Sequence, residues 1–556
     1  IILFVDAAQL SEIVVTGYGS QTKANLTGSV GVVAARELEA RPITSASQSL
    51  QGQVSGVWIN QGSGEPGQDG AQIRIRGIGT LNDANPLILV DGIEAPFDNI
   101  DPNDIESITV LKDAASAAIY GSRAANGVVL VTTKRGRKNS KPVFNYNGYV
   151  GSTSVLNQPD YIWDTNLFMT LRNEADVNSG GQPLYPANIV QKYSNGPNTN
   201  WYDEIFRTGP IQQHSLSVRG GGENTNFNIS VGFLDQDAVV KLTDGSQRYN
   251  ARLNLDTRVN EKFGFGGSFY LSRQESNLDN IGQDGGVLAR ATRLGPNFPA
   301  YDSQGRLADR ARDLDAIELS TPNILAEVQA LNRVLRDDRF LGSFYAEYKP
   351  INGLTIRGTV AANYQGDFDD YFNRRYETYD WETGDLGLIW LENRQLTNFY
   401  GNRLNITSWL QATYEKSFGQ HNFKVIAGAN QESSNYKFFE ASRLEIPSNS
   451  LPALSTGNPE TSTNNGGETE WALRSFFGRL NYDFSNKYLF EFNIRRDGSS
   501  RFGPNNRWSV FPSFSAGWVL SQEDFFNVSW IDFMKVRASW GQLGNQNICL
   551  LYTSPS

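Results

Sequence analysis

Phe227-Asn228-Ile229-Ser230-Val231-Gly232-Phe233 alternates strictly between apolar residues and small or polar ones. Successive side chains of a β-strand point to opposite faces, so this stretch predicts a strand with one apolar face and one polar face. The same pattern returns at Phe263–Leu271, Leu354–Val360 and Tyr488–Ile494. About thirteen such runs follow Pro142. Each has roughly the 9 to 11 residues with which a tilted strand crosses a bilayer.

The connections between these runs alternate in length. Long loops are expected at 153–212, 274–337, 365–402 and 434–473, and tight turns at 221–225, 259–262, 350–353, 416–420 and 485–487. Two links of middle length, 236–246 and 497–507, fall where long loops are due. Outer-membrane barrels have short periplasmic turns and long extracellular loops, whereas a soluble sandwich has no reason to sort its loops by end. The sequence therefore predicts a transmembrane antiparallel β-barrel.

The composition agrees with this fold class. Aromatic residues make up 12% of the 556 residues, whereas there are only two methionines, and mean hydropathy is -0.42. Disordered chains have few aromatic residues, and helical bundles are rich in leucine, alanine and methionine. No run of about 18 consecutive apolar residues occurs, which excludes a transmembrane helix. The rings instead suit the lipid-facing surface and the interfacial girdles of a barrel.

The negative net charge and the scarcity of metal-binding residues restrict the classes of function that the chain could have. A formal net charge of -10 argues against a nucleic-acid partner, because such binding needs a basic face. Cys549 is the only cysteine, and His214 and His421 are the only histidines. A zinc site or a cysteine–histidine catalytic site would have almost no ligands. We therefore expect no metal, no cofactor, no catalytic residue and no enzymatic activity.

The residues before the alternating runs have a different character, with short β-branched runs and few aromatics. Strands are predicted at Ile73–Arg76, Leu87–Val90, Ile105–Leu111 and Val128–Thr133, with an alanine-rich helical turn at Lys112–Tyr120. Together they predict a compact α/β domain, from about residue 12 to residue 137, ahead of the barrel.

Several motifs carry a family resemblance. At the amino end stands Glu12-Ile13-Val14-Val15-Thr16-Gly17-Tyr18-Gly19; by composition alone such a run is more often the last strand of a preceding domain. The α/β domain adds Leu50–Val57, Ile73–Gly77, Pro86–Gly92 and Ile105–Lys134, and the predicted barrel adds Arg495–Phe502, Phe511–Ser513, Ala516–Trp518 and Lys535–Gly541. In this order they resemble the SusC/RagA-like branch of the TonB-dependent outer-membrane receptors.

The resemblance implies import of a large nutrient, an oligosaccharide or a peptide, across the outer membrane of a Gram-negative bacterium of Bacteroidota type. The TonB box is an extended strand that adds to a sheet edge of TonB. It would consist of Glu12, Ile13, Val14, Val15 and Thr16. TonB and its inner-membrane complex would supply the energy. A SusD-like surface lipoprotein would cap the long loops, with lipid around the barrel.

On this basis we expect five regions: the end of a preceding N-terminal extension (1–11), the TonB box and linker (12–25), the plug domain (26–138), the first part of the barrel with long extracellular loops (139–548), and an anomalous tail (549–556). Plugged transporters of this kind have about 22 strands, so the sequence is expected to be a fragment.

Aromatic residues in the long loops are candidates for ligand contact. Trp201, Tyr202, Trp381 and Trp390 could stack on a sugar or a peptide, because rings bring a large contact area at little ordering entropy. Packing of the loops against one another is the alternative. The motifs within the predicted barrel are assigned no role in substrate binding, because arginine and glycine at strand ends also serve turns and ion pairs.

Other patterns have alternative explanations. Gly62-Ser63-Gly64-Glu65-Pro66-Gly67 fits a dinucleotide motif formally, but Pro66 and the following strand favour a plug loop. Asp98, Asp101, Asp104 and Glu106 lack the spacing of a calcium loop, which favours a solvated turn. The basic run 134–138 is expected to be a solvated periplasmic hinge.

Two other functions stay open. A TonB-dependent siderophore or cobalamin receptor would share the architecture. A soluble β-rich glycan-binding protein or glycosidase would use the same aromatic residues, in the latter case with paired carboxylates.

Overall fold

The computed structural model describes residues 13–39, 41–80, 83–96, 98, 100–156, 160–278, 286–315, 323–390, 392–528 and 530–547. The expected extension 1–11, Glu12 of the expected TonB box and the expected tail 549–556 lie outside these residues. Within the described ranges, no helix is long and apolar enough to cross a membrane.

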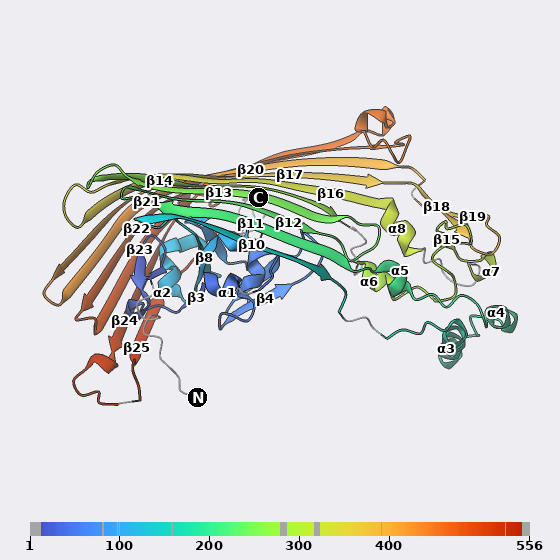
Figure 1. Cartoon of the computed structure of the whole chain (residues 1–556), viewed down its shortest axis with the longest axis horizontal. Helices are drawn as coiled ribbons and strands as arrows, with labels where there is room; N and C mark the ends of the chain where they lie inside the picture. The colour runs from blue at the N-terminus through green and yellow to red at the C-terminus, as the bar shows by residue number, and fades with distance from the viewer. Residues whose placement is uncertain are drawn as a thin grey trace.

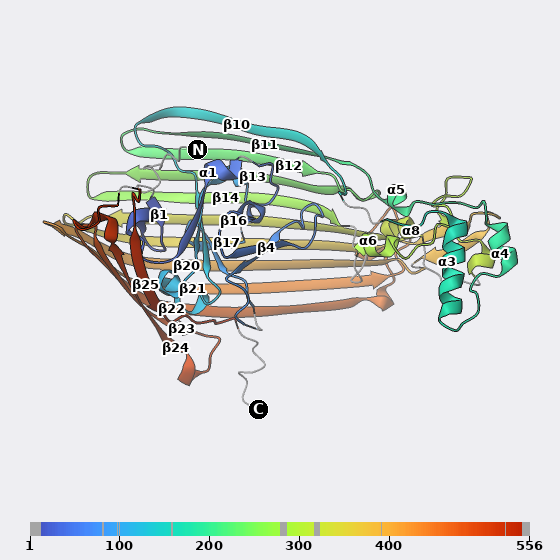
Figure 2. The ribbon, with the colours of Figure 1, turned by 90° about the horizontal axis from the view of Figure 1, so that it is seen from below.

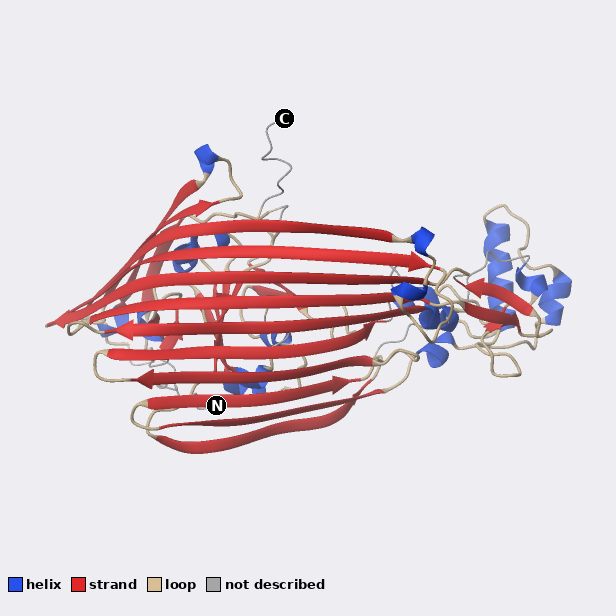
Figure 3. Cartoon of the chain, turned by 90° about the horizontal axis from the view of Figure 1, so that it is seen from above, coloured by secondary structure: helices blue, strands red, loops and turns tan. Residues whose placement is uncertain are grey.

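One antiparallel sheet of 13 strands dominates the molecule, and every strand pairs with its neighbours in chain order (Figures 1 and 3). This confirms the predicted number of strands. The strands are β10 (Ser140–Thr153), β11 (Gly209–Gly221), β12 (Thr225–Gln236), β13 (Gly245–Arg258), β14 (Phe263–Leu278), β16 (Leu331–Tyr348), β17 (Leu354–Asn373), β20 (Gln395–Phe418), β21 (His421–Leu444), β22 (Thr463–Phe484), β23 (Tyr488–Ser499), β24 (Trp508–Val519) and β25 (Lys535–Gly541).

The two faces of the sheet differ as the alternation predicts. On β14 the exposed side chains are Phe263, Phe265, Phe269 and Leu271, whereas Ser268 between them is buried on the other face. The plug lies against that polar face, in the concavity of the curved sheet (Figures 1 and 2). The apolar face therefore points outward, as in a barrel wall that contacts lipid.

The strands run further than the sequence suggested. The tight turns occur where they were predicted, but β20 and β21 each have 24 residues, and much of the expected loops 365–402 and 434–473 is strand. Tyr400 still pairs with Phe439, and Gln395 with Leu444. Backbone pairing continues where side-chain alternation fades, because ladder hydrogen bonds do not depend on hydrophobic patterning. The alternation of apolar and polar residues therefore covers only part of each of these strands.

The plug contains a five-stranded sheet in the order β3-β8-β9-β6-β7, with two hairpins beside it. The predicted strands Leu87–Val90, Ile105–Leu111 and Val128–Thr133 are confirmed residue for residue, and the predicted helical turn is a short α-helix followed by a 3-10 helix. The elements are β1 (Ile13–Val15), β2 (Ser20–Thr22), β3 (Val30–Ala34), α1 (Ala35–Glu39), β4 (Val57–Gln61), β5 (Ala71–Ile75), β6 (Leu87–Val90), β7 (Ile93–Glu94), β8 (Ile105–Leu111), α2 (Ala114–Ala117), η5 (Ala118–Arg123) and β9 (Val128–Thr133).

The plug does not have a core of its own that is separate from the barrel. Val33, Ile108 and Val129 are fully buried in a cluster that also contains Tyr270 and Leu341 of the barrel wall. Removing the plug from the wall would expose this shared apolar surface to water.

Three long loops form one body at the end of the sheet opposite the tight turns, here called the loop cap (Figures 1 and 3). Its strand β15 comes from one loop and pairs with β18 of another. The elements of the loop cap are α3 (Thr165–Asn178), α4 (Ala187–Lys192), α5 (Trp201–Ile205), α6 (Gly286–Ala291), β15 (Ala308–Asp309), α7 (Arg312–Asp315), α8 (Ile324–Ala330), β18 (Tyr376–Asp380) and β19 (Leu386–Trp390).

Candidate functional site: the sealed plug, its N-terminal strand and the cavity beside it

The described part of the predicted TonB box forms β1, which pairs with β2 in a hairpin. The Thr16 amide donates a hydrogen bond to the Gly19 carbonyl at 2.9 Å and closes the turn. Gly17 has φ +85°, and a Cβ there would lie 3.0 Å from the Ile119 side chain. Glycine is therefore required twice over, by the left-handed backbone and by the close approach to the plug.

The hairpin is seated on the inner barrel wall near the tight turns. Arg479 Nη1 donates to the Thr16 carbonyl at 2.7 Å, and Gln21 Nε2 donates to Glu491 Oε2 at 2.8 Å. Val14 is almost completely buried. In this conformation the strand is therefore bound to its own barrel, and the buried side chains of Val14 and Thr16 are not freely available to a partner.

Tyr18 connects this hairpin with both the plug and the wall through its ring. The ring stacks on Phe477 of β22 with centroids 4.1 Å apart and lies 5.9 Å from the Tyr120 ring of the plug. Trp409 of β20 approaches it edge-on at 6.5 Å. Aromatic pairs of this kind contribute about 0.5–1.5 kcal/mol each beyond burial.

Next to Tyr18 a fully buried ion pair of the wall holds η5 of the plug. Arg495 Nε and Asp497 Oδ1 are 2.6 Å apart, and both side chains are almost completely excluded from solvent. Arg495 Nη1 donates to the Ile119 carbonyl at 2.8 Å, and the Ser122 amide donates to Asp497 Oδ2 at 2.7 Å. These charges need this full set of partners, because burying them otherwise costs several kcal/mol.

A second buried cluster fixes the other side of the plug to β11–β14. Arg252 of β13 is fully buried, 3.3 Å from Asp104 Oδ2 and 3.8 Å from Asp91 Oδ2. Asp101 accepts a hydrogen bond from Gln213 of β11 at 3.3 Å. Burial raises the pKa of the Asp104 carboxyl above its ordinary value, while Arg252 opposes the shift. These contacts join the plug to the wall on both sides.

The expectation of a solvated turn at Asp98–Glu106 is therefore wrong for two of its members. Asp101 and Asp104 are almost completely buried. The wall residues Arg252 and Ser230 bind Asp104, whereas Asp101 accepts hydrogen bonds from its neighbour Asn103 at 2.9 Å as well as from Gln213 of the wall. The local sequence does not reveal the contacts with the wall. Among the described residues, no group of three or more histidine, cysteine or acidic side chains could hold a metal ion. Gly62–Gly67 lies in the loop between β4 and β5, as expected.

The basic run after β9 is only partly solvated. Arg135 Nη1 lies 3.0 Å from Asp256 Oδ1 of β13, and Asn254 donates to the Lys134 carbonyl at 2.7 Å. Arg137 and Lys138 are exposed. The run therefore attaches the end of the plug to the wall before the chain enters β10.

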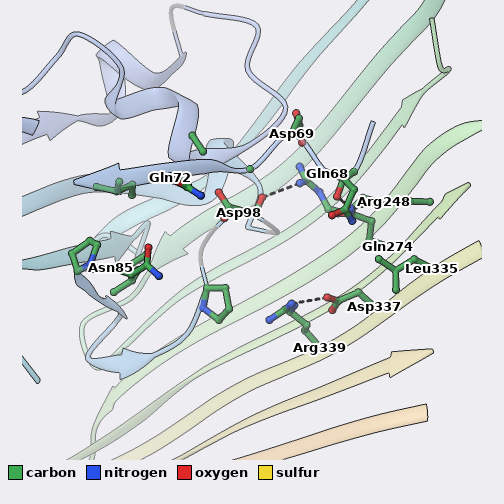
Figure 4. Close-up of a pocket in the computed structure, with 18 residues that line it drawn as sticks. Gln68, Asp69, Gln72, Asn85, Asp98, Arg248, Gln274, Leu335, Asp337 and Arg339 are labelled. Carbon is green, nitrogen blue, oxygen red and sulfur yellow. Dashed lines mark hydrogen bonds and ion pairs between the residues drawn. The ribbon is translucent and has the colours of Figure 1, made fainter. Parts of the chain in front are cut away.

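A cavity of about 600 Å³ separates the plug from the wall on the side of the loop cap (Figure 4). Its lining mixes polar and apolar side chains, and two internal pairs shape it: Arg248 donates to the Asp98 carbonyl at 3.2 Å, and Arg339 binds Asp337 at 2.5 Å. Amide side chains face the same space, among them Gln68, Gln72, Asn85 and Gln274. Such a lining can offer donors and acceptors to a polar ligand.

Two of the loop aromatics that were predicted to contact a ligand are buried inside the loop cap. Trp201 and Tyr202 of α5 are both 0% exposed and lie in the core of the loop cap with Phe298. The Trp201 indole donates to the Gly295 carbonyl at 2.9 Å. Neither ring can reach a ligand in this conformation, so packing of the loops explains both residues.

The other two ring candidates also belong to the loop cap. Trp381 is partly buried and packs against two of its apolar clusters. Trp390 ends β19 opposite Tyr376 of β18. The structure therefore brings Trp381 next to the cap core, and Trp201, Tyr202 and Trp381 lie outside the lining of the cavity.

Comparisons with known proteins agree with this architecture. Residues 22–128 match the family model of the TonB-dependent receptor plug domain. The chain is 34% identical over 99% of its length to TonB-dependent receptor P3 of Formosa agariphila, covering 52% of that protein. It is 31% identical over 99% of its length to TonB-dependent receptor SusC of Bacteroides thetaiotaomicron, covering 55% of it.

Among solved structures, the RagAB peptide importer in the open-open state superposes with a TM-score of 0.82, at 25% identity over 97% of this chain and 62% of that one. The chain thus spans about half the length of the curated relatives it matches. These likenesses extend over nearly all of its residues and agree with its plug, sheet and loop order, so the chain carries a TonB-dependent receptor plug domain and is similar along nearly its whole length to the SusC/RagA-like TonB-dependent receptors.

Proposed function

We propose that the receptor to which this chain belongs imports a large nutrient, an oligosaccharide or a peptide, across the outer membrane with energy from TonB. The observation that carries the proposal is the placement of three parts on one sheet. An extended N-terminal strand lies near the tight turns, a plug fills the concave face, and a cavity with polar amide and charged side chains in its lining opens between plug and wall on the side of the loop cap.

The proposed cycle follows from these contacts. A ligand enters on the side of the loop cap and binds in the cavity beside the plug. The strand 12–16 then loses its contact with Arg479 and pairs with a sheet edge of TonB. Traction from TonB breaks the buried contacts of Arg495 and opens a path past the plug. The outer membrane holds no ATP, so the work has to come from a remote pull.

The proposed partners are TonB with its inner-membrane complex, surrounding outer-membrane lipid, and a SusD-like lipoprotein on the loop cap. A Bacteroidota-type outer membrane is the proposed location, and plug boundaries near 26 and 138 are proposed with it. The likeness to SusC favours this proposal over a siderophore or cobalamin receptor. The relatives are receptors and not enzymes, and the cycle needs no catalytic residue.

Deleting Glu12–Thr16 from the full-length receptor tests the proposal. We expect uptake of labelled ligand by intact cells to fall to the level of a strain without TonB, while ligand binding at the cell surface stays unchanged. The control Val15→Thr keeps a β-branched residue that can pair as a strand, and should retain uptake. Uptake that persists after the deletion would refute the coupling role of this segment.

A further inference from the structure

The plug is attached to the wall on two sides, and on the side of β11–β14 the ion pairs cross from one body to the other. Arg252 of the wall lies 3.8 Å from Asp91 and 3.3 Å from Asp104, both of which belong to the plug. Arg135 of the plug lies 3.0 Å from Asp256 of β13. Separating plug and wall on this side would take both acidic partners from a fully buried arginine, which is costly in a dry interface.

On the side of β20–β24 the buried arginines have acidic partners within their own body. Arg495 and Asp497 both belong to β23. Arg123 of the plug lies 2.5 Å from Glu432 of β21, but it also has a partner in the plug itself, Glu94 at 3.1 Å. When the plug moves away here, Arg495 keeps Asp497 and Arg123 keeps Glu94. Most other contacts that break go to backbone groups of the plug, which water can replace.

The two ends of the plug also lie on different sides. The N-terminal strand β1 is bound to β22, where Arg479 donates to the Thr16 carbonyl. The other end of the plug contacts Asp256 and Asn254 of β13 before the chain enters β10. Tension on the N-terminus therefore acts first on the side of β20–β24, whereas the covalent connection to the wall lies on the side of β11–β14. A body that is pulled at one edge and attached at the opposite edge turns about the attached edge.

We propose that the plug pivots, so that its η5 side leaves β20–β24 while its other side stays on β11–β14. The import path then opens between η5 and the inner face of β21–β23. Its lining consists of Glu432, Arg479, Glu491, Arg495 and Asp497. Glu94 moves with Arg123 and keeps the guanidinium paired throughout. The proposal deepens the proposed function, on which it rests for the source of the traction, and names the side of the plug that the nutrient passes.

Thiol labelling of the full-length receptor in lipid nanodiscs tests the pivot without ligand or TonB. Ser513→Cys and Ser268→Cys form a matched pair, each in a receptor whose other cysteines are replaced by serine. Both serines are almost completely buried, and each hydroxyl lies 3.3 Å from an acceptor of the plug, Ser513 from the Ala115 carbonyl and Ser268 from the Asp91 carboxylate. We expect methanethiosulfonate ethylammonium to label Ser513→Cys at least about tenfold faster than Ser268→Cys, because opening beside β24 leaves fewer charges alone.

Removing the two carboxylates of Arg123 one at a time separates the pivot from general loosening. In the Ser513→Cys receptor, Glu432→Gln should make labelling about fivefold faster, since only the closed state loses an ion pair. Glu94→Gln should make it about fivefold slower, because Arg123 still has Glu432 in the closed state but leaves the wall without a carboxylate. A residue that merely stabilised the closed plug would give faster labelling when replaced.

Equal labelling of Ser513→Cys and Ser268→Cys would overturn the pivot, and so would faster labelling in Glu94→Gln. The heat-dependent shift of folded barrels on gels establishes that each variant is folded. If Ser268→Cys does not fold, Ser272→Cys takes its place, since Ser272 lies on the same strand and is 7% exposed. None of these measurements involves transport, whereas uptake after deletion of Glu12–Thr16 decides the proposed function, so the two can fail separately.

Discussion

Replacing Arg495 by methionine is expected to loosen the plug by about 3–5 kcal/mol, the usual cost of leaving one partner of a buried ion pair alone. The guanidinium is fully buried and holds Asp497, Ser475 and the Ile119 carbonyl of the plug. Without it the Asp497 carboxylate keeps the Ser122 amide but loses its countercharge. Hydrogen exchange of plug amides 118–123 should become at least about a hundredfold faster, since 1.4 kcal/mol is a factor of ten.

Two controls separate this effect from general damage to the barrel. Arg495→Met combined with Asp497→Asn removes both charges, and we expect exchange to return most of the way to that of the unaltered receptor. Arg273→Met breaks an exposed pair on the outer face, worth about 1 kcal/mol or less, and should leave plug exchange unchanged. Equal exchange rates in Arg495→Met and in the unaltered receptor would contradict the role of this pair.

Tyr18→Ala is expected to release the N-terminal strand without any ligand. Its ring holds the hairpin between Phe477 and Tyr120, and loss of two or three ring contacts corresponds to about 1–4 kcal/mol. A strand that is already detached binds TonB without the cost of leaving the wall. The apparent Kd for the periplasmic domain of TonB should therefore fall by about fivefold to several hundredfold.

Tyr18→Phe is the matched control for this prediction. It keeps the stacked ring and loses only the long contact between the Tyr18 hydroxyl and Arg495, at 3.4 Å. Its affinity for TonB should stay within about threefold of that of the unaltered receptor. If Tyr18→Ala binds TonB no better than Tyr18→Phe does, the ring does not hold the strand in place.

The fold could be predicted from the sequence because its signals are local. Alternation at Phe227–Phe233 identifies a strand without knowledge of its neighbours, and the tight turns separate one hairpin from the next. Short β-branched runs located β6, β8 and β9 in the plug. The strand ends were missed where polar residues occupy both faces, as at Gln395–Asn402, because pairing there leaves no hydrophobic period.

The contacts that seal the plug could not be predicted in the same way. Asp104 and Arg252 are 148 residues apart, and only the strand register and the curvature of the sheet bring them together. Arg252 is one of several polar residues on the inner face of β13, and nothing in its neighbours distinguishes it. Arg495 and Asp497 belong to a motif that the sequence shows, but their partner, η5, is brought to them only by the three-dimensional fold.

The burial of Trp201 and Tyr202 could not be predicted for a related reason. Trp201 and Tyr202 are large and lie in a long loop, which suits a ligand platform and a packed core equally well. The choice between them depends on residues of another loop, such as Phe298, which lies 4.9 Å from Trp201 between ring centroids. Exposure of a loop residue cannot be inferred from its own segment when loops pack on one another.

A reversible tether between plug and wall tests the central claim most directly. The Thr27 and Ser515 hydroxyls are 2.7 Å apart and buried, close enough for a disulfide after replacement of both residues by cysteine in a receptor with Cys549→Ser. A matched tether joins Thr225 and Thr257, which are 3.3 Å apart within the wall. If the plug has to move, the oxidised Thr27→Cys/Ser515→Cys receptor will import no ligand, the reductant will restore import, and the wall tether will have no effect. Import at the normal rate through the oxidised plug tether would contradict the account.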